Sequence, residues 1–166
     1  MCGIAGAIYT ETGRHDAVGV VNEVLREQRG RGPDHSGSCE IRPSPIHSVI
    51  LGHTRLKITD LSDQANQPMW DVTGQYVITF NGEIYNHGEL REELISLGYR
   101  FRTKSDTEVV LNAFIHWGME STHRFIGSFA FAIVGLREGK CFLVRDRFGK
   151  CPLNASPVSS AQARRD

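Results

Sequence analysis

The pattern of hydrophobic and polar positions predicts several short strands separated by loops. Apolar or alternating runs, which are typical of strands, occupy residues 2–8, 48–53, 76–80, 129–134 and 141–144. The last two runs flank a glycine-containing turn, so we expect them to form a hairpin. We expect the run at 76–80 to end at Asn81-Gly82, and only a short strand, 39–41, within an otherwise irregular segment.

Three other segments carry apolar residues at helical spacing. They lie at residues 16–29, 86–97 and 105–117, and a glycine follows each of them. We expect Asp16 to cap the first helix and Leu97 to belong to the core face of the second. Strands and helices do not alternate strictly, so the pattern predicts an α+β fold and not a doubly wound parallel sheet.

Composition and charge narrow the class of protein. The chain has 166 residues, of which 40% are hydrophobic, which suits one globular domain. Its 19 basic and 19 acidic residues cancel, which argues against a nucleic-acid partner or a basic membrane-binding patch. We find no apolar run of transmembrane length and no signal peptide, and we expect a cytoplasmic protein.

The cysteines and histidines give no sign of a metal site. The four cysteines are widely spaced and contain no C-x-x-C pair, which disfavours both zinc binding and a disulfide framework. None of the seven histidines has the spacing of a metal ligand, and we interpret them as surface or core residues. Free cysteines suit a reducing compartment.

Cys2 directly follows the initiator methionine. If Met1 is removed, Cys2 carries both a thiol and a free α-amine. An α-amine has a pKa near ~7.7–8.0, so it can accept a proton at neutral pH. The simpler alternative is a buried thiol that begins a strand, because free cysteine packs as a small hydrophobic residue.

Two basic stretches could bind a substrate. The loop Arg29–Asp34 could be a polar clamp or only a turn. Arg55 follows a buried strand, and its planar guanidinium suits a carboxylate, although an exposed arginine at a strand end is the commoner case.

Two further stretches could stabilise charge. Asn81-Gly82 offers an amide side chain and a glycine N–H that could form an oxyanion hole, although Asn-Gly is also a strong hairpin signal. If Ser105 is the N-cap of the third helix, Asp106 lies in its first turn. Its carboxylate could bind a ligand or only compensate the helix dipole.

Seven motifs in sequence give these stretches a common explanation. They are Met-Cys-Gly-Ile-Ala-Gly at 1–6, Arg-Gly-Pro-Asp at 31–34, Gly-His-Thr-Arg-Leu at 52–56, Ala-Asn-Gln-Pro at 65–68, Asn-Gly-Glu-Ile-Tyr-Asn-His at 81–87, Ser-Asp-Thr-Glu at 105–108 and Arg-Asp-Arg-Phe-Gly at 145–149. Together they resemble the class II glutamine amidotransferase domain of glutamine-hydrolysing asparagine synthetases. The resemblance extends from residue 1 to about residue 153.

The resemblance implies a fold and a set of site residues. The fold is that of N-terminal nucleophile hydrolases, a four-layer αββα sandwich of two antiparallel sheets. Cys2 matches the nucleophile, and Asn81 and Gly82 match the oxyanion hole. The residues that match the glutamine pocket are Arg55, Leu56, Lys57, Ile58, Thr59, Asn81, Gly82, Glu83 and Asp106. The loop 31–34 matches a segment that shapes the site near the nucleophile.

The resemblance also implies the reaction. Glutamine is hydrolysed to glutamate and ammonia without a cofactor and without a metal, and the ammonia serves an asparagine-synthetase-type reaction. ATP and Mg²⁺ belong to a synthetase domain, whose pyrophosphate loop is missing from this sequence. We therefore expect a domain at 1–153 followed by a disordered tail at 154–166, as in a truncated or frame-shifted product or a fragment.

Other interpretations remain open. The chain could be a non-catalytic remnant or a module that only binds glutamine. It could also supply ammonia to a cell-surface polysaccharide precursor, or to a sugar or nucleotide acceptor, although its motif forms disfavour the latter two. The sequence leaves open whether the chain forms a homo-oligomer.

Overall fold

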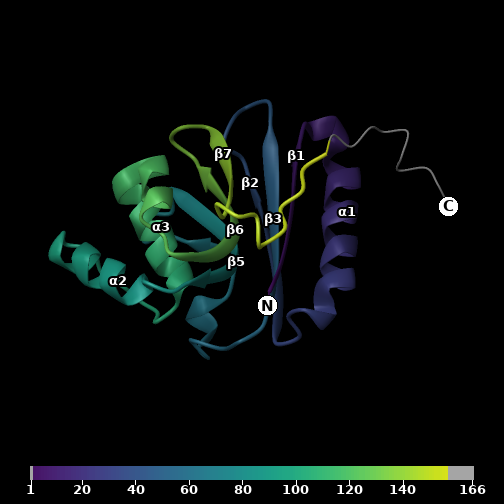
Figure 1. Ribbon diagram of the computed structural model, residues 1–166. Coiled ribbons are helices and arrows are strands. Elements are labelled where there is room, and N and C mark those ends of the chain that lie inside the picture. Colours follow the sequence, from purple (N-terminus) through teal and green to yellow (C-terminus); the bar gives the residue numbers. More distant parts are fainter. Residues whose placement is uncertain (1, 157–166) are drawn as a thin grey trace.

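The computed structural model describes residues 2–156, and its elements form four layers. Figure 1 shows helix α1 on one side, two stacked sheets in the middle, and helices α2 and α3 on the other side. This αββα order confirms the layered α+β fold that the sequence predicts. The predicted tail begins at residue 154, and residues 157–166 of it lie outside the described residues.

Both sheets are antiparallel. The first sheet has the order β1-β3-β2, with β1 at Gly3–Tyr9, β2 at His35–Ile41 and β3 at Ser48–Arg55. The second has the order β4-β5-β6-β7, with β4 at Met69–Trp70, β5 at Tyr76–Ile84, β6 at Gly127–Gly135 and β7 at Lys140–Arg145. The predicted hairpin of β6 and β7 is confirmed.

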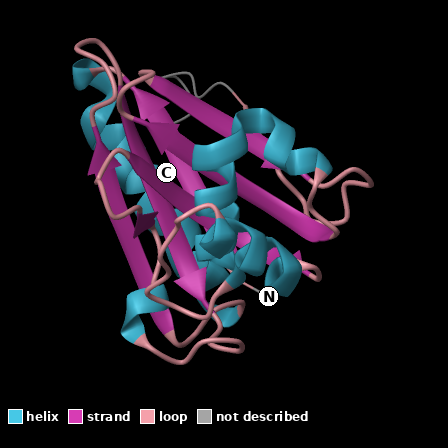
Figure 2. Cartoon of the chain, turned by 90° about the vertical axis from the view of Figure 1, so that its left-hand side faces the viewer, coloured by secondary structure: helices cyan, strands magenta, loops and turns pink. Residues whose placement is uncertain are grey.

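Three helices cover the outer faces of the sheets. Helix α1 spans Arg14–Glu27 and packs on β1 and β3. Helix α2 spans His87–Ser96 and α3 spans Asp106–Trp117; in Figure 2 they lie in front of the second sheet. Short 3₁₀ helices lie at Glu11–Gly13, Gln28–Gly30, Asp63–Ala65 and Gly118–His123.

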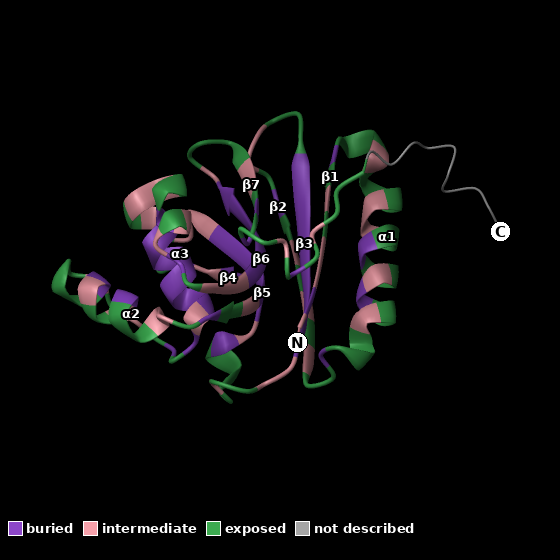
Figure 3. Cartoon of the chain, viewed as in Figure 1, coloured by how far each residue is buried: buried purple, intermediate pink, exposed green. Residues whose placement is uncertain are grey.

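Strand side chains alternate between two apolar layers, because successive residues of a strand face opposite sides. On β3, Val49 and Leu51 pack between the sheets, whereas Ile50 packs under α1. On β6, Val134 lies between the sheets and Phe131 lies under α2 and α3. Figure 3 shows β3 buried along its length. Because both faces of these strands are buried, their sequences are continuous apolar runs and do not alternate with polar residues.

Glycine at position 52 permits the close approach of α1 to this sheet. A Cβ atom added there would lie 2.9 Å from Leu25 Cδ1 and 3.1 Å from Val21 Cγ1. Both neighbours are buried. A larger residue at position 52 would therefore push α1 away from β3.

The structure corrects two predictions about strands. β5 does not end at Asn81-Gly82 but continues to Ile84, because residues 81–84 pair with β6. β2 spans His35–Ile41 and is longer than the predicted 39–41, because its pairing with β3 extends over the whole strand. Neither change could be seen in the hydrophobic pattern, since polar and small residues dominate both segments.

Two predictions about the helices are wrong in detail, and one about a helix cap is confirmed. Helix α1 begins at Arg14, so Asp16 lies in its first turn and does not cap it. Leu97 follows α2 and is 47% exposed, so it is not part of the core. Ser105 does cap α3 through its hydroxyl, which accepts the Glu108 N–H over 3.4 Å, and the Glu108 carboxylate accepts the N–H groups of Arg102 and Thr103.

Candidate active site

The Cys2 thiol lies against the backbone of Leu56. The Leu56 N–H donates to Cys2 Sγ over 3.4 Å, and the thiol faces the Leu56 carbonyl oxygen at 3.9 Å. Gly3 pairs with Thr54 in the sheet, which brings Cys2 beside the end of β3. On the other side, Arg31 Nε donates to the Cys2 carbonyl oxygen over 3.2 Å. Residues far apart in sequence thus hold Cys2 at one end of the first sheet.

Arg55, the last residue of β3, is buried and only partly satisfied. One terminal nitrogen donates to the Ser62 carbonyl oxygen and to Asn66 Oδ1, each over 2.7 Å. The other donates to the Asp60 carbonyl oxygen. A guanidinium has five N–H groups, so these bonds leave the Nε–H and one terminal N–H for another partner. Two parallel N–H groups suit a carboxylate.

The segment after Arg55 forms an irregular loop rather than a strand. Its Lys57 N–H donates to Asp34 Oδ2 over 2.8 Å, which connects it to the loop 31–34. Ile58 is 71% exposed, and Thr59 is also exposed. Asp60 accepts the Lys104 N–H over 2.7 Å, so the loop is joined to the segment before α3. Leu56 therefore lies at the Cys2 thiol, whereas Ile58 and Thr59 project outward.

Asn81 faces the space between the sheets. Val77 lies in the core between the sheets, and the Thr79 hydroxyl donates to the Gly52 carbonyl oxygen of β3 over 3.0 Å. By strand alternation, the side chain of Asn81 faces the same way. It is 3% exposed, and its Oδ1 has no hydrogen-bond partner within residues 2–156. A buried amide oxygen without a partner is costly, so this group is available to a ligand.

The N–H of Gly82 faces the free edge of β5. Gly82 pairs with Phe129, whose N–H and C=O both bond to Asp146 on the opposite side of β6. In an antiparallel ladder, hydrogen-bonded and non-bonded pairs alternate, so the Gly82 backbone groups face away from β6. The N–H groups of Phe80 and Ile84 share this edge and donate to the side chains of Gln67 and Asp106.

Gly82 also has a conformation that favours glycine. Its φ is +151°, and an added Cβ would lie 2.2 Å from the Ser128 carbonyl oxygen and 2.6 Å from Phe129 Cα. Both obstacles are backbone atoms, which cannot move aside without shifting the strand. The motif therefore needs glycine at this position for steric as well as chemical reasons.

Asp106 lies at the start of α3 and closes the same edge. Its Oδ2 accepts the Ile84 N–H over 3.2 Å. Burial raises the pKa of this carboxyl above its usual range, against the opposing effects of the Ile84 N–H and of His87. A cation bound beside Asp106 would relieve the cost of burying its charge. Glu83 is exposed and pairs with Ser128 in the strand.

Two residues near this site were not predicted to act there, His53 and Gln67. His53 is fully buried, and its Nε2 contacts the Phe80 carbonyl oxygen at 3.2 Å. Gln67 is also buried and accepts the Phe80 N–H over 2.6 Å. Both belong to motifs quoted above, at 52–56 and 65–68, but the sequence gives them no partner because Phe80 is distant along the chain.

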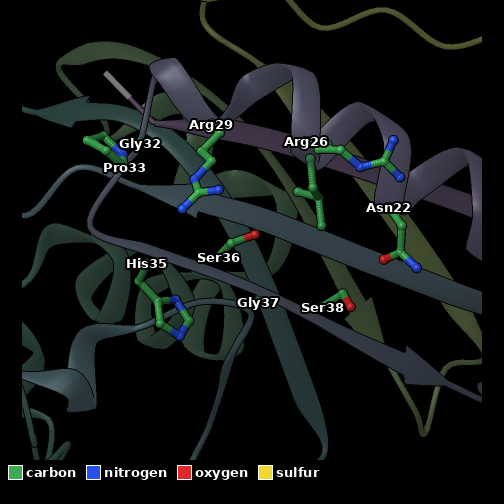
Figure 4. A pocket seen from close by; sticks show the side chains of 10 residues that line it. Asn22, Arg26, Arg29, Gly32, Pro33, His35, Ser36, Gly37 and Ser38 are labelled. Atoms are coloured by element: carbon green, nitrogen blue, oxygen red, sulfur yellow. The ribbon is translucent and has the colours of Figure 1, made fainter.

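Two surface grooves lie away from the residues predicted for the glutamine pocket. One groove of about 460 Å³ lies between α1 and β2, and in Figure 4 Arg29 points toward Ser36. A second, of about 610 Å³, follows β1 and is lined in part by Leu143 and Leu153. Neither groove is lined by a residue that the resemblance assigns to the glutamine pocket.

Residues 2–156 contain neither a metal-binding cluster nor a membrane-spanning helix. No three His, Cys, Asp or Glu side chains there are placed to hold a metal ion. Every helix of the same range is too short or too polar to cross a bilayer.

Comparison with known proteins decides the family. A family model described as "Glutamine amidotransferase domain" matches residues 1–163. The chain belongs to this family. It is 36% identical over 163 residues to a putative glutamine-hydrolysing asparagine synthetase of Mycobacterium tuberculosis. This match covers 92% of this chain and 25% of that protein. It is 34% identical over 154 residues to asparagine synthetase 3 of Bacillus subtilis, with 92% of this chain and 24% of that protein covered.

The amidotransferase domain therefore spans about a quarter of the length of these curated relatives. Among solved structures, glutamine phosphoribosylpyrophosphate amidotransferase of B. subtilis, complexed with ADP and GMP, superposes with a TM-score of 0.65 at 19% identity. The match covers 82% of this chain and 35% of that one. At this identity the likeness concerns the fold, and it confirms the predicted N-terminal nucleophile hydrolase fold.

Proposed function

We propose that this domain hydrolyses L-glutamine to L-glutamate and ammonia, with Cys2 as the nucleophile after removal of Met1. The observation that carries the proposal is the position of the Cys2 sulfur against Leu56, one residue after Arg55. The thiol thus lies beside the backbone that directly follows Arg55, and the Arg55 guanidinium keeps two N–H groups free. A glutamine α-carboxylate held by Arg55 would keep its side chain within reach of the sulfur.

The other predicted residues receive roles around this pair. Asp106 holds the α-ammonium group, with Glu83 at the outer side of the same pocket. The backbone of Leu56, Lys57, Ile58 and Thr59 forms the pocket wall after Arg55, while the Ile58 and Thr59 side chains point outward. The Asn81 Nδ2–H group and the Gly82 N–H donate to the oxyanion, and losing such a donor typically costs about 10²–10³ in rate.

The reaction would proceed in two steps. The Cys2 thiol gives its proton to its own α-amine and attacks the side-chain amide carbon of glutamine. The resulting ammonium group then protonates the leaving ammonia, which leaves a γ-glutamyl thioester. Water hydrolyses this thioester to glutamate and regenerates the thiol. No cofactor is needed for these steps.

We further propose that the ammonia serves asparagine biosynthesis. The support is the family of relatives, which are named glutamine-hydrolysing asparagine synthetases. The acceptor reaction would use ATP and Mg²⁺ in a synthetase partner, which this domain would supply with ammonia. We assign the reaction to the cytoplasm, since free cysteines persist in a reducing compartment.

Glutamate release from purified protein tests the proposal. We expect the wild-type chain to convert glutamine to glutamate, and Cys2→Ala to abolish this activity. Cys39→Ala is the matched control, because Cys39 lies on β2 in the core between the sheets, and it should remain active. Binding of glutamine without turnover would instead indicate a module that only binds it.

A further inference from the structure

We propose that His53 and Gln67 are positioning residues that clamp the Phe80 backbone and thereby aim the oxyanion donors Asn81 and Gly82. The inference rests on the glutamine hydrolysis proposed above. The two side chains bind opposite ends of the same backbone unit. His53 contacts the Phe80 carbonyl oxygen at 3.2 Å, and Gln67 Oε1 accepts the Phe80 N–H over 2.6 Å.

The clamp replaces a missing neighbouring strand. β4 pairs only with Val77 and Ile78, so the edge of β5 beyond Ile78 has no partner strand. Buried backbone groups need partners, and side chains supply them at Phe80. A longer β4 would also occupy the Gly82 N–H, which lies two residues further along the same edge. His53 and Gln67 therefore satisfy the hydrogen-bonding groups of Phe80 and leave the Gly82 N–H free to bind a ligand.

His53 connects the two sheets at this point. It lies on β3, two residues before Arg55, and it is fully buried. A carbonyl oxygen can only accept, so the bond to Phe80 requires the proton on Nε2. Burial lowers the pKa of His53 to about 4, so the ring is neutral near pH 7. His53 thus fixes the oxyanion strand relative to the sheet that carries Cys2 and Arg55.

Gln67 connects the same strand to α3. While its Oε1 accepts from Phe80, its Nε2 donates to Thr107 Oγ1 over 3.1 Å. Both Gln67 and Thr107 are buried, and Thr107 follows Asp106 in the first turn of α3. The Gln67 side-chain amide therefore sets the distance between the oxyanion donors and Asp106. The donors would bind the side-chain end of a glutamine molecule, and Asp106 would bind its α-amino end.

The two arms of the clamp predict different kinetic effects. His53→Leu removes only the contact with Phe80, so kcat should fall at least about tenfold. This fall should be smaller than the loss of about 10²–10³ in kcat that deleting an oxyanion donor causes. KM for glutamine should stay within about twofold, because Arg55 and Asp106 are untouched. Thr107→Val loosens only the α3 arm, and should raise KM about fivefold or more with little change in kcat. Gln67→Met should show both effects.

Conservative variants separate positioning from simple destabilisation. In His53→Gln the side-chain amide can reach the position of Nε2 and donate to Phe80, so kcat should recover to within about threefold of wild type. In His53→Asn the amide lies nearer the backbone and cannot reach, so kcat should remain low. This polar pair keeps the test valid if His53→Leu does not fold. His47→Leu and Gln64→Met are the matched controls, since both side chains are exposed.

The closing experiment measures inhibition by glutamate γ-semialdehyde on the full chain. The Cys2 thiol adds to its aldehyde, forming a carbon–sulfur bond and an alkoxide that mimics the tetrahedral oxyanion, and the thiol proton goes to the α-amine. We expect Ki to rise at least about tenfold in His53→Leu and His53→Asn but not in His53→Gln, while inhibition by L-glutamate stays unchanged. Wild-type Ki in His53→Asn would overturn the clamp alone. A wild-type chain without glutaminase activity would overturn both the clamp and the proposed function.

Discussion

Arg55 shows how one side chain can serve both the structure and the substrate. Three of its N–H groups hold the loop at Asp60, Ser62 and Asn66, and two remain. The motif at 52–56 predicted that Arg55 binds the substrate, but nothing in the sequence predicted that it also holds the loop. Loop anchoring depends on contacts with residues whose positions no local pattern specifies.

We expect Arg55→Lys to raise KM for glutamine at least about tenfold. A lysine ammonium cannot hold the loop carbonyls and a carboxylate in the planar arrangement of a guanidinium. Steady-state kinetics would measure the change, with Arg100→Lys as control, because Arg100 is exposed and lies outside the site. An unchanged KM in Arg55→Lys would remove Arg55 from the substrate pocket.

Asp106 predicts how glutamine binding depends on pH. Its pKa is raised by burial, and only the ionised form attracts the α-ammonium group. KM should therefore rise as pH falls toward this raised pKa, since the neutral acid binds the cation weakly. Asp106→Asn should have a high KM that no longer varies in this way. A wild-type KM that depends on pH no more than that of Asp106→Asn would contradict the role.

At the scale of single elements, β5 carries most of what the sequence missed. Its apolar half, 76–80, was predicted, because alternating hydrophobic residues report burial directly. Its second half contains Asn81, Gly82 and Glu83, which resemble a turn in any local reading. Pairing with β6 keeps them extended. The motifs nevertheless identified these residues as a site, so resemblance supplied what periodicity could not.

We expect Gly82→Ala to destabilise the domain by roughly 2–4 kcal/mol, because the new Cβ would collide with backbone atoms of β6 at a positive φ. Gly88→Ala provides the control. Gly88 lies in α2 with open space around its Cα, so alanine there should be neutral or stabilising by up to ~1 kcal/mol. Equal unfolding midpoints in denaturant for the two variants would show that position 82 is not constrained.

At the scale of the whole molecule, the two sheets meet through two kinds of contact. An apolar cluster that includes Val49, Leu51 and Val134 joins them over one part of the interface. Near the candidate site they are joined by the polar contacts of Thr79 with Gly52 and of His53 with Phe80. The layered fold could be predicted from the resemblance. The two polar contacts between the sheets could not be predicted from the sequence, because they depend on how the strands of one sheet are aligned with those of the other.

The buried His53 predicts that the domain loses stability in mild acid. Its pKa is about 4 in the folded chain against 6.5 as the ordinary value, so the unfolded chain binds more protons between these limits. Stability should therefore fall as pH drops from about 6.5 to 4, by up to about 3 kcal/mol. Denaturant unfolding at several pH values should show a smaller fall in His53→Gln. Identical pH dependence in both proteins would contradict this.

After loss of Met1, Cys2 is expected to attack the side chain of glutamine. A diazoketone analogue of glutamine tests it by alkylating the nucleophile with loss of N₂, and peptide mass spectrometry locates the adduct. Burial raises the pKa of the Cys39 and Cys141 thiols to about 11, so they should react slowly. We predict one adduct, on Cys2 of chains that lack Met1, formed more slowly when L-glutamine is present. An adduct on another cysteine, or none at all, would contradict the account.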